Sequence, residues 1–290
     1  MDLFLQQLSN GLVIGSTYAV VAVGFALAFT VLRVIQFAHP EVFMIGMFSG
    51  MMAANVLPGG GLLVGLIGGA LGATISGAVI ESAVIAPLRG RDVLTTLIAT
   101  IGVSVILQNG MAVLVGPDPV PYPRLLPAQF FEIGPVLITL RQLFNVGLSL
   151  LLLALASFYV RGTRIGRATR AIAERPDVAA AFGVDVRQVC RITIWLASAM
   201  GGIAAVAVGT LYGSASAFVG MLYGLKAFVC MLVAGNRYFE AVIAVGLALG
   251  VLEALVTGYV SSSMRDAVAF LVLIGVLYLR PNGLFGSYAT

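Results

Sequence analysis

Four ionisable residues lie inside long apolar stretches of the chain, where a charge is costly: Glu41, Glu81, Lys226 and Glu253. Such residues are functional candidates by default, because a membrane helix tolerates a charge only when it is paired or borders a polar cavity. Glu253 is the most deeply placed along its stretch. Two interpretations of Glu253 stay open, a structural ion pair and a place on a translocation path, where a carboxylate that titrates would couple a carrier to protons.

The other residues with chemical potential argue against several classes of enzyme. The only lysine, Lys226, is followed by Ala227 rather than Ser or Thr, so the sequence has no P-loop and no ATPase site of that type. The only histidine, His39, lies in no HExxH motif, and no G-x-S-x-G motif occurs. Cys190 and Cys230 show no CxxC spacing, which argues against a metal site. We therefore expect a protein that is not an enzyme and that binds no cofactor or metal itself.

The composition that surrounds these residues indicates a membrane protein. Of the 290 residues, 60% are hydrophobic and 10% are charged, and the mean hydropathy is +1.06. Soluble domains use roughly 45–50% apolar residues. The apolar runs are continuous rather than alternating, which predicts helices and not the strands of a barrel. The expected fold class is an all-α polytopic membrane protein, formed as a single transmembrane domain over residues 1–290.

Eight or nine apolar stretches approach the ~20 residues that a helix needs to cross a bilayer. The second stretch is short and follows the polar segment 36–41, so we expect a discontinuous or re-entrant helix there. The ninth is also short and ends at Arg280 and Pro281. The stretches are residues 12–32, 41–56, 62–86, 94–115, 143–160, 192–211, 217–234, 241–260 and 267–279.

Basic residues gather on one side of these stretches. The loop 161–188 carries six arginines, and Arg89, Arg91 and Arg280 fall on the same side if each stretch crosses once. By the positive-inside rule this side is cytoplasmic, and the net charge of +4 needs no nucleic-acid partner to explain it. The other side holds the Pro-rich loop 116–142, which we expect to be a semi-rigid extracytoplasmic connector. Simple counting places the N-terminus outside and the C-terminus inside, unless the second segment is re-entrant.

The basic loop contains an Ala-rich segment that is typical of a short helix ending at Gly183. Ala171, Val178, Ala179 and Phe182 could line an apolar stripe on it. Such a stripe is suited to the groove of a soluble partner. The alternative is a solvated connector that only obeys the positive-inside rule.

Three motifs lie at the start, the middle and the end of the chain. The first is Gly15-Ser16-Thr17-Tyr18-Ala19 followed by Phe37-Ala38-His39, the second is the Ala-rich segment 166–185, and the third is Arg280-Pro281-Asn282-Gly283-Leu284-Phe285-Gly286. Together they resemble the motifs of ABC-importer permeases of the high-affinity branched-chain amino-acid family. Gln36, Pro40 and the segment 234–241 depart from the pattern of that family, which leaves the substrate open.

The resemblance implies a permease domain in the bacterial cell inner membrane that works within a larger assembly. The implied partners are a second homologous permease subunit, two cytoplasmic ATPase subunits that use ATP and Mg, and a periplasmic or lipoprotein solute-binding protein. Segment 163–187 would dock on an ATPase, with these candidate coupling residues: Gly166, Arg167, Arg170, Ala171, Asp177, Ala179, Phe182 and Gly183. The candidates for the translocation path are Ser16, Tyr18, His39, Glu41 and Glu253.

The function expected from the resemblance is translocation of branched-chain or related amino acids that a solute-binding protein delivers. An importer permease for urea or short amides is an alternative within the same class. A secondary carrier that uses Glu253 to couple an ion is an alternative from a different class.

Overall fold

The computed structural model describes residues 2–56, 61–235 and 239–285, and most of them are helical. Within these residues seven helices are long and apolar enough to cross a membrane. This result confirms the all-α polytopic class. The seven are α1 (Asp2–Leu32), α3 (Gly61–Ile80) with its continuations η1 (Glu81–Ile85) and α4 (Ala86–Leu88), α5 (Val93–Val115), α6 (Leu140–Gly162), α9 (Val186–Tyr212), α11 (Phe239–Tyr259), and α12 (Arg265–Leu279) preceded by η2 (Ser262–Met264).

Two predicted stretches form shorter or more polar helices, so the expected eight or nine spans are corrected to seven. Helix α10 (Val219–Ala234) has 16 residues, about 24 Å at 1.5 Å per residue, which is less than the ~30 Å of the hydrocarbon core. Helix α2 (His39–Val56) has 18 residues but begins with His-Pro-Glu. Its first residue, His39, is buried beside Gly24, eight residues before the end of α1. The helix after the polar segment therefore starts inside the bundle, as a discontinuous helix would.

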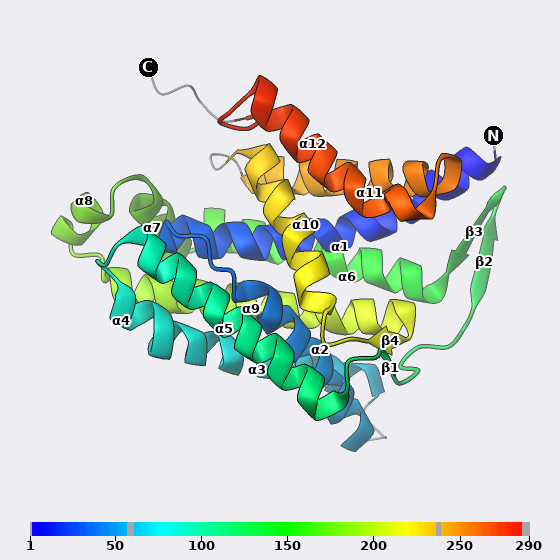
Figure 1. Cartoon of the computed structure of the whole chain (residues 1–290), viewed down its shortest axis with the longest axis horizontal. Coiled ribbons are helices and arrows are strands. Elements are labelled where there is room, and N and C mark those ends of the chain that lie inside the picture. The colour runs from blue at the N-terminus through cyan, green and yellow to red at the C-terminus, as the bar shows by residue number, and fades with distance from the viewer. Residues whose placement is uncertain (1, 57–60, 236–238, 286–290) are drawn as a thin grey trace.

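The two ends of the long axis differ in structure (Figure 1). Helices α7 (Arg164–Glu174) and α8 (Pro176–Ala181) lie at one end, which we call the basic end. The hairpin of β2 (Phe130–Ile133) and β3 (Val136–Thr139) lies at the other, which we call the hairpin end. A second strand pair, β1 (Val120–Pro121) with β4 (Ser214–Ala215), ties the Pro-rich loop to the end of α9.

Helix α1 runs the full distance between the two ends. Near its start, Gln6 exchanges two hydrogen bonds with the backbone of Leu137 in the hairpin, at 3.1 and 2.9 Å. Just after its last residue, Arg33 donates to the carbonyls of Ala173 and Glu174 at the end of α7, each at 2.6 Å. The N-terminal part of the chain therefore lies at the hairpin end and the C-terminal part at the basic end, as simple counting of single crossings predicts (Figure 1).

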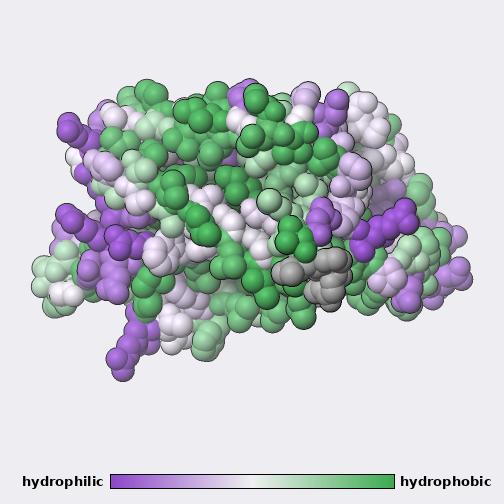
Figure 2. Space-filling view, turned by 90° about the horizontal axis from the view of Figure 1, so that it is seen from below, coloured by the Kyte–Doolittle hydropathy of each residue, from purple (hydrophilic) through white to green (hydrophobic). Residues whose placement is uncertain are grey.

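The surface has the distribution expected of a membrane protein. Figure 2 shows hydrophilic residues gathered toward both ends of the long axis and a mainly hydrophobic belt between them. Inside the bundle, small residues allow close helix contacts where lipid offers no hydrophobic drive for association. The buried row of α3 is an example, since its Gly69 lies against Gly46 of α2 and Gly202 of α9.

Candidate functional site

A cluster of charges surrounds Glu253, which is 0% exposed on α11. Its Oε2 atom accepts hydrogen bonds from the Tyr18 hydroxyl (2.8 Å), from Lys226 Nζ (2.9 Å) and from Arg265 Nε (3.2 Å). Lys226 Nζ also lies 2.9 Å from Asp266 Oδ1. We call these five residues the ionic cluster. It joins α1, α10, α11 and α12, with Tyr18, Lys226 and Glu253 buried and Asp266 exposed.

The charges of the ionic cluster balance, because two acids face two bases. A lone buried ion carries a desolvation penalty of several kcal/mol, and good geometry with several hydrogen bonds offsets it. This arrangement favours the structural interpretation of Glu253 over a free carboxylate that titrates during transport. Lys226 is 4% exposed and pairs inside the bundle.

A cavity of about 470 Å³ lies beside the ionic cluster, toward the hairpin end. Among the residues that the structure describes, Arg265 is the one charged side chain on its wall, and the same guanidinium contacts Tyr18 and Glu253. The volume falls in the range of roughly 300–1,000 Å³ that ligand pockets occupy. Its other lining side chains are the amides and hydroxyls of Gln7, Asn10, Thr139, Gln142, Tyr212 and Thr257 and the apolar groups of Val13, Ile14, Leu211 and Ala254.

A second polar group lies where the chain passes from α1 to α2. Gln36, His39 and Glu41 are each less than 4% exposed. His39 packs edge-on against the ring of Phe25, with centroids 5.7 Å apart. Glu41 Oε1 accepts a hydrogen bond of 3.0 Å from Ser104 of α5. Among the described residues, Glu41 Oε2, His39 Nδ1 and both amide atoms of Gln36 have no hydrogen-bond partner.

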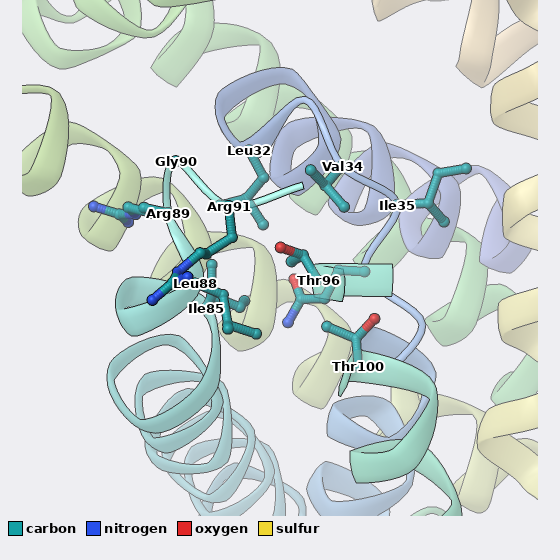
Figure 3. Close-up of a pocket in the computed structure, with 11 residues that line it drawn as sticks. Leu32, Val34, Ile35, Ile85, Leu88, Arg89, Gly90, Arg91, Thr96 and Thr100 are labelled. Carbon is teal, nitrogen blue, oxygen red and sulfur yellow. The ribbon is translucent and has the colours of Figure 1, made fainter. Parts of the chain in front are cut away.

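Gln36 also lines a pocket of about 120 Å³ at the basic end. Figure 3 shows Thr96 and Thr100 of α5 on one side of this pocket, with Leu32 of α1 and Val34 just after this helix nearby. Arg89 and Arg91 lie at its rim. Its volume is below the range of roughly 300–1,000 Å³ that ligand pockets occupy.

The five predicted path residues fall into separate places. Tyr18 and Glu253 meet in the ionic cluster, and His39 and Glu41 belong to the polar group at the start of α2. Ser16 joins neither, because its hydroxyl donates to the Val13 carbonyl of its own helix at 2.8 Å. Their role in a path stays a prediction.

The predicted coupling loop forms two helices at the basic end rather than one. Arg175 separates α7 from α8, which begins at Pro176, since a proline has no amide hydrogen to continue the preceding helix. Arg175 donates to Asp177 at 3.2 Å, and this hydrogen bond lowers the pKa of that exposed carboxyl. Gly183 has a φ of +83°, which favours glycine and ends the segment as predicted.

The prediction of an apolar stripe on this loop is wrong in part. The break after α7 places Ala171 and Val178 on different helices, and Ala179 is buried against Ile172 and Val189 instead of facing outward. Phe182 is 85% exposed. Of the remaining coupling candidates, Gly166 is buried at the corner with α6, and the exposed ones are Arg167, Arg170, Ala171, Asp177 and Gly183.

Several residues of these groups were missed from the sequence. Arg265 and Asp266 complete the ionic cluster from the start of α12, and no local pattern marks them. The polar residues of α5 had a visible signal, a recurrence every four residues in an otherwise apolar stretch. They are Thr96, Thr100, Ser104 and Gln108.

Comparison with known proteins gives matches along nearly the whole chain. Residues 7–277 match the family described as "Branched-chain amino acid transport system / permease component". The high-affinity branched-chain amino acid transport system permease protein LivH of Escherichia coli K12 is 35% identical over 98% of this chain and 96% of its own. The corresponding protein BraD of Pseudomonas aeruginosa is 33% identical with the same coverage. A chain of the solved structure "PsaBC from Streptococcus pneumoniae in complex with Fab" shares the fold, with a TM-score of 0.52, 14% identity and coverage of 97% and 94%.

Proposed function

Because the chain belongs to the family of branched-chain amino acid transport system permeases, we propose that it is the membrane-spanning subunit of an ATP-driven importer for branched-chain or related amino acids. The observation that carries the proposal is the match to named permeases over almost their full length. The names of these relatives favour amino acids over urea or short amides as the solute. Family membership also confirms the resemblance seen in the three sequence motifs.

The proposed assembly contains a second permease subunit, two cytoplasmic ATPase subunits and an extracytoplasmic solute-binding protein. ATP and Mg bind to the ATPase subunits, and this chain supplies no nucleotide site. The positive-inside rule makes the basic end cytoplasmic, so α7 and α8 would meet the ATPases there. The Pro-rich loop and the hairpin would face the binding protein. The bacterial relatives support a place in the cell inner membrane.

The contacts of α7 suggest how movement of an ATPase would reach the bundle. Arg33 joins the end of α7 to the end of α1 through two hydrogen bonds. Helix α1 in turn carries Tyr18 of the ionic cluster. A displacement of α7 would therefore move α1, which acts as a rigid element. Rigid-body movements of this kind convert a transporter between its inward-facing and outward-facing states.

Uptake by cells with and without the ATPase partner tests the proposal. Cells that carry the complete importer should accumulate radiolabelled leucine, and deletion of the ATPase gene should abolish this uptake. Uptake that persists in the deletion strain would contradict the ATP-driven reading and support the ion-coupled carrier. The ion pairs of Glu253 with Lys226 and Arg265 weigh against a carboxylate that titrates to drive such a carrier.

A further inference from the structure

One face of α5 carries a polar stripe, formed by Thr96, Thr100, Ser104 and Gln108. Residues four apart lie on the same face of a helix, and at 1.5 Å per residue this stripe is about 18 Å long. Most other residues of α5 are apolar, and several of them face outward, such as Val105, which is 52% exposed. Thr96 is 8% and Thr100 1% exposed, so the start of the stripe faces the protein interior.

The stripe lies along the polar group between α1 and α2. Thr96 and Thr100 share a pocket with Gln36 (Figure 3), and Ser104 donates to Glu41. Nine buried side-chain polar atoms of the described residues lack a partner, and five of them belong to Gln36, His39, Glu41 and Gln108. Because buried polar groups in proteins are nearly always paired, their concentration here indicates a place that a polar ligand or water fills.

Glu41 differs from the other acids within the apolar stretches, because it has no cation beside it. Glu81 lies 2.8 Å from Arg89, and Glu253 lies 2.9 Å from Lys226. No ion pair of Glu41 is found among the described residues, although its side chain is 1% exposed. The helix dipole at the first turn of α2 stabilises the negative charge of Glu41 by at most ~2 kcal/mol. This is less than the several kcal/mol that burial of one ion costs.

The free oxygen of Glu41 lies against α10 at Gly220. A Cβ atom built on Gly220 would lie 3.0 Å from Glu41 Oε2 and closer still to the Pro40 carbonyl oxygen, so α2 and α10 are in close contact here and must separate before a ligand atom reaches this oxygen. Ser104 holds the other carboxylate oxygen and leaves Oε2 directed toward Gly220. The site thus offers one fixed negative group and several neutral donors and acceptors.

We propose that Glu41 binds the ammonium group of a zwitterionic amino acid, and that the polar stripe of α5 forms one wall of the route that leads to it. The hydroxyls and amides of Thr96, Thr100, Gln108 and Gln36 are neutral, so they exchange hydrogen bonds with either end of the solute without trapping it. This inference rests on the proposed function and adds to it the group that recognises the solute.

The test uses the complete importer in proteoliposomes with its binding protein. Radiolabelled leucine uptake and ATP hydrolysis are measured for the wild type, Glu41→Gln, Glu41→Asp and the control Glu132→Gln, an exposed acid of the hairpin. Glu41→Gln should lower uptake at least about tenfold, since a hydrogen bond to a charged group is worth ~1.5–3 kcal/mol. ATP hydrolysis should stay near the wild-type rate, and the control should transport normally.

The outcomes separate this inference from the proposed function. Failure of the wild type to take up amino acids would contradict the proposed function itself. Normal uptake by Glu41→Gln would overturn only the inference. The inference would also be overturned if Glu41→Gln lost both ATP hydrolysis and uptake while its melting temperature stayed that of the wild type. If the importer does not assemble with Glu41→Gln, the Glu41→Asp variant tests the inference. It should raise the KM for uptake with little change in kcat, and an unchanged KM would contradict the assignment.

Discussion

The hydroxyl of Tyr18 donates a hydrogen bond of 2.8 Å to Glu253, a residue 235 positions later in the chain. Tyr18 lies on the first helix and Glu253 on α11, and the same carboxylate oxygen binds Lys226 and Arg265. The first and the last helices of the bundle are thus joined at one buried atom. This contact sets the first prediction.

Replacement of Glu253 by Gln should destabilise the protein by about 3–5 kcal/mol, because Lys226 and Arg265 then lack their shared counter-charge. Thermal unfolding of the purified protein in detergent measures this effect. Combining Glu253→Gln with Lys226→Met leaves the Arg265 and Asp266 charges balanced and should recover part of the loss. Wild-type stability of the single variant would show that the cluster does not contribute to folding.

Loss of the Arg33 side chain should separate ATP hydrolysis from uptake. Arg33 has a φ of +54°, a conformation that glycine adopts without strain, so Arg33→Gly keeps the backbone and removes both hydrogen bonds to α7. We expect ATP hydrolysis by the complete importer to continue while leucine uptake falls several-fold. Equal loss of both activities, or no loss, would contradict the role given to this contact.

Phe182→Ala should weaken the attachment of the ATPase subunits. Phe182 is 85% exposed at the basic end, and large exposed aromatic residues often anchor interfaces, where truncation costs about 2 kcal/mol or more. Co-purification of the ATPase with the tagged permease gives the measurement. Phe130→Ala, which also removes an exposed phenylalanine but at the hairpin end, serves as the matched control and should recover the ATPase normally.

Cysteine labelling can test which face of α5 borders an aqueous route. A charged, membrane-impermeant thiol reagent should modify Gln108→Cys in the assembled importer, and leucine with its binding protein should slow the reaction. Val105→Cys, on the outward apolar face, should stay unlabelled because lipid excludes a charged reagent. The natural thiols, Cys190 and Cys230, are buried. Equal labelling of both positions would argue against a polar route along the stripe.

Long apolar runs were enough to predict the helices, because inside the bilayer a helix satisfies the polar backbone groups of a continuous apolar segment. The short length of α10 was not predicted, because hydropathy alone does not show that Pro40 of α2 packs against the first turns of α10. The ion pair between Lys226 and Asp266 was also not predicted. The two residues are 40 positions apart, and such a pair appears only after three helices have packed. The stripe on α5, in contrast, could have been read from its four-residue spacing.

The ionic cluster also has a consequence for biosynthesis. The chain emerges from the ribosome in order, so Lys226 reaches the membrane before Glu253, and Arg265 with Asp266 arrives last. Helix α10 is short and carries an unpaired lysine at that moment, so by itself it is a poor candidate for stable insertion. Stable insertion of α10 in the bilayer therefore depends on α11 and α12, which have not yet been translated. A truncation before α12 therefore removes two of the four charges and leaves the preceding pair without the network that secures it.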